Sequence, residues 1–183
     1  MMIRFCKLCG SDINYKTPEG DSIKRAICVN CNSIDYENPK IIAGILPVYR
    51  NEILLCQRAI DPKKNKWTIP AGFLELGETL EEGALREAKE EACISPNITQ
   101  LYCIFNLPHI GQVYMLYLAT LTQRKASPGI ETESVDFFSF DSIPWNDIAF
   151  SSVDFILRNY ISDYPSKKFP LRSENTINKV INE

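Results

Sequence analysis

The chain has 183 residues, and its 20 Lys plus Arg against 23 Asp plus Glu give a net charge of −3. This length fits one domain, or one domain and a small module, and 45% hydrophobic with 23% charged residues is typical of a globular chain. The slightly acidic balance argues against a nonspecific nucleic-acid binder. No apolar run approaches the ~20 residues of a membrane helix. The first residues show no apolar secretion signal, so we expect a cytoplasmic protein without membrane contact.

Four of the seven cysteines form two C-x2-C pairs separated by 18 residues: Cys6 with Cys9, and Cys28 with Cys31. This spacing is typical of a four-cysteine zinc site, because Zn²⁺ accepts four thiolates in a tetrahedron. Gly10 follows the first pair, where such a turn often needs a positive φ. A closed site of four sulfurs leaves no position for a substrate. We therefore predict a structural zinc in a module over residues 1–37.

The dipeptide Asn38-Pro39 marks a boundary after this module. Beyond it, apolar runs predict strands over residues 41–49, 52–58, 112–122 and 135–140. Residues 166–183 are polar and predict a loosely ordered C-terminal tail. The expected organisation is a second domain over residues 38–165, and the fold class is α+β.

Helical spacing of apolar residues predicts a helix over residues 151–164, with Ser151 or Ser152 as its N-cap. The three cysteines outside the pairs lie in apolar stretches: Cys56, Cys93 and Cys103. We expect all three to be packed in the core rather than reactive.

Negative charge is concentrated between residues 72 and 94, which hold seven Glu against one Arg and one Lys. Thr79-Leu80-Glu81-Glu82 fits a capping box, which predicts a helix that begins near Leu80. The small residues Ala84 and Ala88 would let one side of this helix approach a sheet closely.

Three carboxylates follow on one face of the same helix, because Glu87, Glu90 and Glu91 are spaced i, i+3, i+4. Like charges so placed destabilise a helix by ~0.2–0.5 kcal/mol per pair. A divalent cation would turn this repulsion into attraction, and carboxylate oxygens select Mg²⁺ or Mn²⁺. The alternative is a solvated face supported by i, i+4 pairs of Arg86 with Glu82 and Glu90. The charge pattern alone leaves both open.

The same stretch resembles the Nudix box, G-x5-E-x7-R-E-U-x-E-E-x-G-U, in which U is a bulky aliphatic residue. Seven positions match: Gly72, Glu78, Arg86, Glu87, Glu90, Glu91 and Ile94. Two differ, since Ala88 is small where U is expected and Cys93 replaces the second glycine. A glycine there would ease the exit from the helix.

This resemblance implies a Nudix α/β/α sandwich around a mixed sheet, preceded by a small zinc ribbon. It implies a catalytic set of Glu78, Arg86, Glu87, Glu90 and Glu91. Glu87 and Glu91 would be the principal Mg²⁺ ligands, with Glu90 a further ligand, and the backbone carbonyl near Gly72 could also reach the metal. Glu78 would pair with Arg86 and hold the loop–helix geometry. The implied reaction is hydrolysis of a nucleoside diphosphate linked to another group.

Outside the box, the ribbon and the segments 67–73, 107–112 and 148–152 follow the order of a zinc-ribbon Nudix group. That group includes the plant plastid FAD pyrophosphatase and bacterial relatives described as ADP-ribose pyrophosphatases. The implied substrates are ADP-ribose or FAD, giving AMP plus ribose 5-phosphate or FMN. NADH pyrophosphatase or RNA-decapping activity is the alternative, although the S-Q-P-W-P-F-P-type motif of those enzymes is absent. A nucleoside-triphosphate hydrolase is a third option.

Glu131 and Glu133 follow the long strand, in a region where several Nudix enzymes supply a base or a metal ligand. We favour Glu131 over Glu133 for such a role, and a box glutamate is a further candidate for the water-activating base. A solvated loop carboxylate is the alternative for either residue. Trp67 or Phe73 could stack on an aromatic base, although core packing is the commoner role of such residues.

The expected partners are a small-molecule nucleotide, Mg²⁺ or Mn²⁺, and structural Zn²⁺, and a homodimer stays open. A competing hypothesis is a non-catalytic zinc-ribbon binding protein on a degenerate Nudix scaffold. Residues 1–40 hold six Lys plus Arg and five Asp plus Glu, so the module is not basic and nucleic acid is not expected. The complete set of box glutamates favours catalysis.

Overall fold

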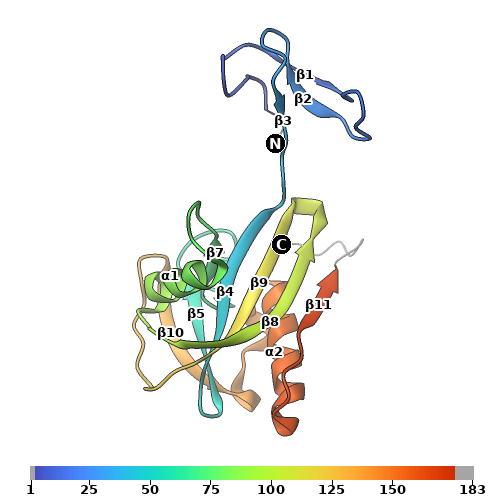
Figure 1. The fold of residues 1–183 in the computed structure, drawn as a ribbon. Helices are drawn as coiled ribbons and strands as arrows, with labels where there is room; N and C mark the ends of the chain where they lie inside the picture. The colour runs from blue at the N-terminus through green and yellow to red at the C-terminus, as the bar shows by residue number, and fades with distance from the viewer. Residues whose placement is uncertain (1–2, 176–183) are drawn as a thin grey trace. The chain divides into compact units, whose positions relative to one another are not determined.

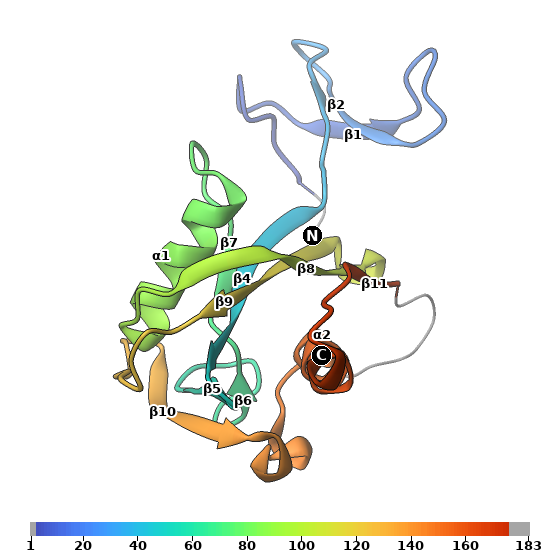
Figure 2. The same ribbon diagram turned by 60° about the horizontal axis from the view of Figure 1, so that its bottom comes forward.

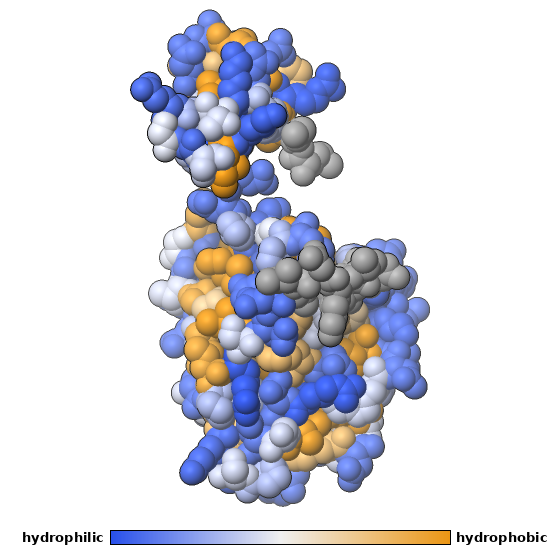
Figure 3. Space-filling view, turned by 90° about the vertical axis from the view of Figure 1, so that its right-hand side faces the viewer, coloured by the Kyte–Doolittle hydropathy of each residue, from blue (hydrophilic) through white to orange (hydrophobic). Residues whose placement is uncertain are grey.

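The computed structural model describes residues 3–175, and the chain divides into two units between Asn38 and Pro39. This division falls at the dipeptide that the sequence marks as a boundary. No helix in the described range is long and apolar enough to cross a membrane. On the face drawn in Figure 3, hydrophobic residues lie in small groups among hydrophilic ones.

The first unit is a three-stranded antiparallel sheet in the order β1–β2–β3. Its strands are β1 (Ile13–Lys16), β2 (Arg25–Cys28) and β3 (Ile34–Asp35). Gly10 has a φ of 73°, and its N–H donates to the Cys6 carbonyl at 2.9 Å. That φ lies in the left-handed region that glycine adopts without steric cost. The turn expected after the first cysteine pair is therefore present.

The second unit is built on one mixed sheet with the strand order β10–β5–β4–β9–β8–β11, and β6 and β7 pair with β5 and β4 (Figure 1). The strands are β4 (Lys40–Tyr49), β5 (Glu52–Arg58), β6 (Trp67–Thr68), β7 (Ala71–Phe73), β8 (Asn97–Leu107), β9 (Gln112–Thr120), β10 (Thr132–Ser139) and β11 (Arg172–Asn175). The central strands β4 and β9 run parallel, β5 is antiparallel to its neighbours, and β8 is antiparallel to β9 but parallel to β11.

Two helices cover opposite faces of this sheet, α1 (Leu80–Ala92) and α2 (Ser151–Asp163) (Figures 1 and 2). Alternate residues of β5 supply the two cores, since Ile53 and Leu55 pack on the α2 side while Leu54 and Cys56 pack on the α1 side. Strands that are buried on both faces have continuous apolar runs in their sequence. The structure confirms the predicted α/β/α sandwich with a mixed sheet.

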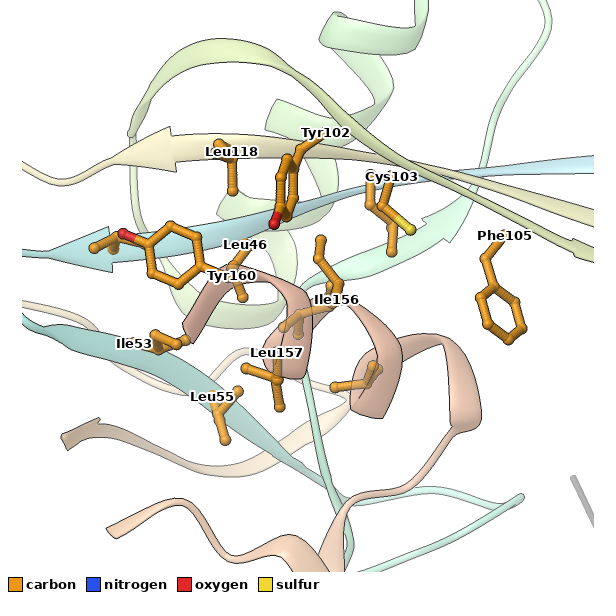
Figure 4. Close-up of a cluster of buried hydrophobic side chains, with 14 of the residues drawn as sticks. Leu46, Ile53, Leu55, Tyr102, Cys103, Phe105, Leu118, Ile156, Leu157 and Tyr160 are labelled. Atoms are coloured by element: carbon orange, nitrogen blue, oxygen red, sulfur yellow. The ribbon is translucent and has the colours of Figure 1, made fainter. Parts of the chain in front are cut away.

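The core under α2 contains the larger side chains (Figure 4). Ile156 and Leu157 of α2 lie against Leu46, Ile53 and Leu55 of the sheet, and all five are fully or almost fully buried. Burying one such aliphatic side chain stabilises the fold by about 1.5–3 kcal/mol. This core holds α2 on the sheet beside the strands that carry the candidate site.

The start of α1 is the predicted capping box. The Thr79 hydroxyl accepts the Glu82 N–H at 3.2 Å, and a Glu82 carboxylate oxygen accepts the Thr79 N–H at 2.8 Å. The buried residues Ala84, Ala88 and Ala92 form the side of α1 that packs on the sheet. Small side chains here let the helix backbone approach β4 and β7 closely.

The end of α1 corrects one expectation. Cys93 was predicted to pack in the core, and so were Cys56 and Cys103. The latter two are buried, but Cys93 is exposed and is the C-cap of α1 with a φ of 52°. The chain leaves the helix through the left-handed conformation that the missing glycine would favour. The turn at the end of α1 therefore leaves Cys93 exposed, although its neighbours in the sequence are apolar.

We expect Cys93→Gly to stabilise the protein. A non-glycine residue in the left-handed region costs roughly 1–2 kcal/mol, and the entropy of a more flexible unfolded chain offsets part of the gain. A net gain of about 0.5–1 kcal/mol should raise the melting temperature by ~1–4 °C. Differential scanning calorimetry measures this shift. Cys93→Ala, which removes the thiol but keeps the Cβ, should give no comparable rise.

Two expectations about the C-terminal region are also corrected. The N-cap of α2 is Phe150 rather than Ser151 or Ser152, and no side chain caps this helix. The tail predicted over residues 166–183 is wrong for its first part, because β11 pairs in parallel with β8. Phe169 stacks on Tyr160 with their ring centroids 5.2 Å apart. Such long-range contacts order a polar segment, and residues 176–183 lie outside the described range.

Candidate functional sites

The four paired cysteines lie together in the first unit, with their sulfur atoms all within 4.8 Å of one another. Cys9 Sγ is 3.4 Å from Cys28 Sγ and 3.6 Å from Cys31 Sγ, and Cys6 Sγ is 3.7 Å from Cys31 Sγ. Zn–S bonds of ~2.3 Å in a tetrahedron place sulfurs about 3.8 Å apart. The arrangement therefore fits a four-sulfur metal site.

Backbone N–H groups also point at these sulfurs. Leu8 N–H donates to Cys6 Sγ at 3.4 Å, and the N–H groups of Asn30 and Cys31 donate to Cys28 Sγ at 3.4 Å each. Such hydrogen bonds favour thiolate over thiol, which is the form that binds metal. Both C-x2-C turns thus supply backbone hydrogen bonds to a sulfur atom, as is typical of metal-binding cysteines.

In the second unit, α1 and β7 bring the predicted carboxylates beside the sheet. Glu87 lies so close to Gly72 that a Cβ added at Gly72 would be 2.3 Å from Glu87 Oε1. The Ala71 N–H donates to Glu91 Oε2 at 3.3 Å. Only a residue without a side chain leaves this space at position 72, which explains the glycine of the motif in physical terms. Glu90, on the same face, is largely exposed.

Arg86 binds three of the predicted residues. It holds Glu78 with two hydrogen bonds of 2.8 and 3.1 Å, and its Nη2 also donates to the Phe73 carbonyl at 3.0 Å. Its Nη1 donates to Glu87 at 2.6 Å and to Glu90 at 3.1 Å. Two parallel bonds fix the planar guanidinium. Arg86 therefore ties the loop before α1 to the helix that carries the carboxylates.

The electrostatics of the helix face are unusual for glutamates. Burial and, after it, the negative charge of Glu87 raise the pKa of Glu91 to about 8, although the Ala71 N–H and the positive charge of Arg58 act in the opposite direction. Burial also raises the pKa of Glu87, which the hydrogen bond from Arg86 opposes. Buried carboxylates with raised pKa values favour a bound proton or a bound cation over free charge. This pair of groups can therefore hold a divalent metal ion.

Stability without added Mg²⁺ should depend on pH through Glu91. Because its folded-state pKa is raised above the unfolded value, its contribution is fully present below about pH 4.5 and is lost as the pH rises through about 8. The free energy of unfolding should fall across this window by an amount on the order of a few kcal/mol. Urea titrations at several pH values should show this slope, and Glu91→Gln should flatten it. An identical slope in both proteins would contradict the assignment.

The carboxylates of α1 lie on one face of the helix, but their oxygen atoms are not gathered as closely as the sulfur atoms of the four cysteines. Over residues 3–175, the four cysteines are the one group of three or more Cys, His, Asp or Glu whose ligand atoms converge in this way. Of the two later candidates, Glu131 lies near the site, since its charge raises the pKa values of Glu87 and Glu91. Glu133 is not among the main groups that shift either pKa.

A pocket of about 310 Å³ opens beside the carboxylates. Ala71 and Gly72, which contact Glu91 and Glu87, also line this pocket. Its walls are mainly apolar, and among them is Phe73, half of whose surface is exposed. Trp67 instead packs edge-on against Phe138 in the core.

Three further residues of this region were missed by sequence reasoning. Arg58 lines the pocket with its guanidinium 5.1 Å from the Phe150 ring centroid, and its charge reaches Glu91. Ser152 also lines the pocket, with a buried hydroxyl that has no partner within the described residues. Gly129 contacts the last turn of α1. Their neighbours are distant in sequence, so no local pattern indicates them.

The chain matches two protein-family models. The NUDIX domain model matches residues 38–157, and the Nudix N-terminal zinc-ribbon model matches residues 4–37. A curated relative, the ADP-ribose pyrophosphatase of Methanocaldococcus jannaschii, is 27% identical over 115 residues, which cover 60% of this chain and 67% of that protein. The NAD-capped RNA hydrolase NudC of Vibrio atlanticus is 30% identical over 145 residues, 78% of this chain. The matched region spans about half (51%) of that NudC protein.

Among solved structures, a NUDIX hydrolase from Nitrosomonas europaea aligns with a TM-score of 0.92 and 45% identity. The alignment covers 97% of this chain and all of that one, so it includes both the cysteine-bearing unit and the sandwich. The family model alone covers more than half of the chain. From its fold, its box and these matches, the chain belongs to the Nudix hydrolase family and carries the family's N-terminal zinc ribbon.

Proposed function

We propose that this protein hydrolyses, with Mg²⁺, the diphosphate bond of a nucleoside diphosphate linked to another group, with ADP-ribose or FAD as substrate. The observation that carries the proposal is the pair of partly buried glutamates, Glu87 and Glu91, held against Gly72 and Ala71, two residues that also line an apolar pocket. Placing two negative charges in a partly buried site costs free energy, and a bound cation would offset that cost.

In this proposal Glu87 and Glu91 are the principal metal ligands and Glu90 is a further one. The backbone carbonyl near Gly72 completes the protein's ligands. Held by these residues, Mg²⁺ would supply positive charge that stabilises the negative charge developing on the phosphates. Arg86 is bonded to Glu78 and also donates to Glu87, so the protein itself holds the Glu87 carboxylate in position before the substrate binds. Charged groups that are held in position in advance commonly make the largest contribution to the rate enhancement of enzymes.

The pocket supports a nucleotide substrate. Its apolar walls suit a planar ring, and the exposed face of Phe73 can stack on one. Because Ala71 and Gly72 belong to both the pocket and the carboxylate site, a ring in the pocket would place the attached diphosphate beside Glu87 and Glu91. Arg58 lines the same pocket, and its positively charged guanidinium would attract a phosphate bound there.

Product analysis tests the proposal. Purified protein with Mg²⁺ is incubated with ADP-ribose, FAD, NADH and a set of nucleoside triphosphates, and the products are separated by chromatography. AMP with ribose 5-phosphate or with FMN is the expected result. Release of reduced NMN (NMNH) with AMP from NADH alone would favour the second candidate, a NudC-type activity, which the similarity to NudC proteins supports. No product from any substrate would favour the non-catalytic alternative.

Glu131 is the proposed base that activates water. Its charge acts on both Glu87 and Glu91. Glu131→Gln should lower kcat by about 10²-fold, the lower end of the range for general-base catalysis, with little change in KM. Glu133→Gln is the matched control, since this exposed glutamate lies two residues further on and should keep the activity. Equal losses in the two variants would count against a specific role of Glu131.

A further inference from the structure

The loop between β9 and β10 is bound to the last turn of α1. Gly129 N–H donates to the Glu91 carbonyl at 3.0 Å, and Ser127 N–H donates to the Ala92 carbonyl at 3.0 Å. The last four carbonyls of a helix have no partner within it. Backbone N–H groups from a distant loop thus complete the end of the helix that carries the box glutamates.

The contact at Gly129 leaves no room for a side chain. A Cβ at this position would lie 1.6 Å from the Glu90 carbonyl oxygen and 3.3 Å from Glu91 Cα. The first distance is far below any real contact, and the atom it meets is helix backbone, which cannot turn aside. The need for glycine here comes from close approach. Any larger residue would push the loop away from α1.

The other side of the loop is attached to the sheet. Glu131 is two residues beyond Gly129, and its carbonyl accepts the Ala59 N–H at 2.9 Å. Thr132, the first residue of β10, pairs with Arg58. Glu131 therefore lies between an anchor on the helix and an anchor at the end of β5. The spacing between its carboxylate and those of α1 depends on both anchors.

We infer that Gly129 is a positioning residue, which by its close contact with the end of α1 sets the placement of Glu131 beside Glu87 and Glu91. The inference rests on the proposed function, because it takes Glu131 as the base. Gly129 itself touches no substrate. Its effect on catalysis passes through Glu131, since a displacement of about 1 Å in a catalytic group can cost up to 10²-fold in rate.

The test is a double-mutant cycle in the full-length protein with zinc bound. Gly129→Ala should lower kcat by at least about 10-fold and leave KM nearly unchanged. In the Glu131→Gln background the same substitution should cost little more, because the group that it misplaces is already absent. Mn²⁺ affinity, measured by electron paramagnetic resonance, should stay unchanged if the glutamates of α1 keep their places.

Ile130→Ala is the matched control, since this neighbouring side chain is 99% exposed and its loss should leave kcat unchanged. If Gly129→Ala does not fold, Ser127→Pro replaces it in the cycle, because it removes the bond to Ala92 without adding an atom at position 129. Additive losses in the double variant, or an unchanged kcat in Gly129→Ala, would overturn the inference. If wild type hydrolyses its substrate and Glu131→Gln is fully active, the inference fails while the proposed function stands.

Discussion

Glu91→Gln should lower the Mg²⁺-dependent kcat by 10²–10³-fold, the range that follows the removal of one preorganised electrostatic group. Glu91 is the most buried of the three carboxylates, and its burial already makes the free charge unfavourable, with a pKa of about 8. Glutamine keeps nearly the same shape but removes the charge that would hold the cation. Release of AMP at a series of Mg²⁺ concentrations measures the effect, and half-saturation should move to higher Mg²⁺.

The pH dependence of metal binding provides a second readout for Glu91. Below pH 8 a proton competes with the cation for this carboxylate, so Mg²⁺ affinity should rise with pH up to about 8 and then level off. Glu81→Gln is the matched control, because Glu81 lies exposed in the first turn of the same helix. Loss of activity in both variants would show that the charge of the helix in general matters, and loss in neither would contradict the role of Glu91 as a metal ligand.

Cys28→Ser should abolish tight zinc binding and unfold the first unit. This unit has short strands and few buried side chains, so a bound metal must supply most of its folding free energy. Structural Zn²⁺ contributes about 10–16 kcal/mol in small zinc modules. Metal analysis of the wild type should give one zinc per chain, and the variant should become sensitive to trypsin at the basic residues before Asn38.

Cys93→Ser controls for the loss of a thiol as such. Cys93 is exposed in the second unit and belongs to no cysteine cluster, so this variant should keep its zinc and its resistance to trypsin. If Cys28→Ser retained zinc and protease resistance, the four-sulfur site would be wrong. Melting of the second unit should be similar in all these proteins, because its two cores lie within residues 39–183.

Much of α1 could be predicted because its signals are local. The capping box lies within four consecutive residues, and the glutamates that share a face are one turn apart, so helix geometry alone brings them together. The pairing of Glu78 with Arg86 belongs to the same short range of the chain. The cysteine pairs are similar, since each C-x2-C turn aims two sulfurs by its own backbone.

The burial of Cys93 was predicted wrongly because it depends on the exit from the helix, which apolar neighbours do not reveal. The capping of α2 was wrong for a related reason. Serine is a common N-cap, but the chain enters this helix one residue earlier, at Phe150, and Ser152 turns into the interior. Local preferences are worth about 1 kcal/mol, and tertiary packing outweighs them.

The sequence by itself thus determined the helix with its box glutamates and the cysteine set, because each depends on short-range spacing, and it indicated the sandwich through the resemblance to the Nudix box. Only the tertiary structure decided that the charges of Arg58 and Glu131 act on Glu91 and that Gly129 contacts the end of α1. It also decided the raised pKa of Glu91. These properties arise from burial and from contacts between segments far apart in the chain, and no local pattern of residues encodes them.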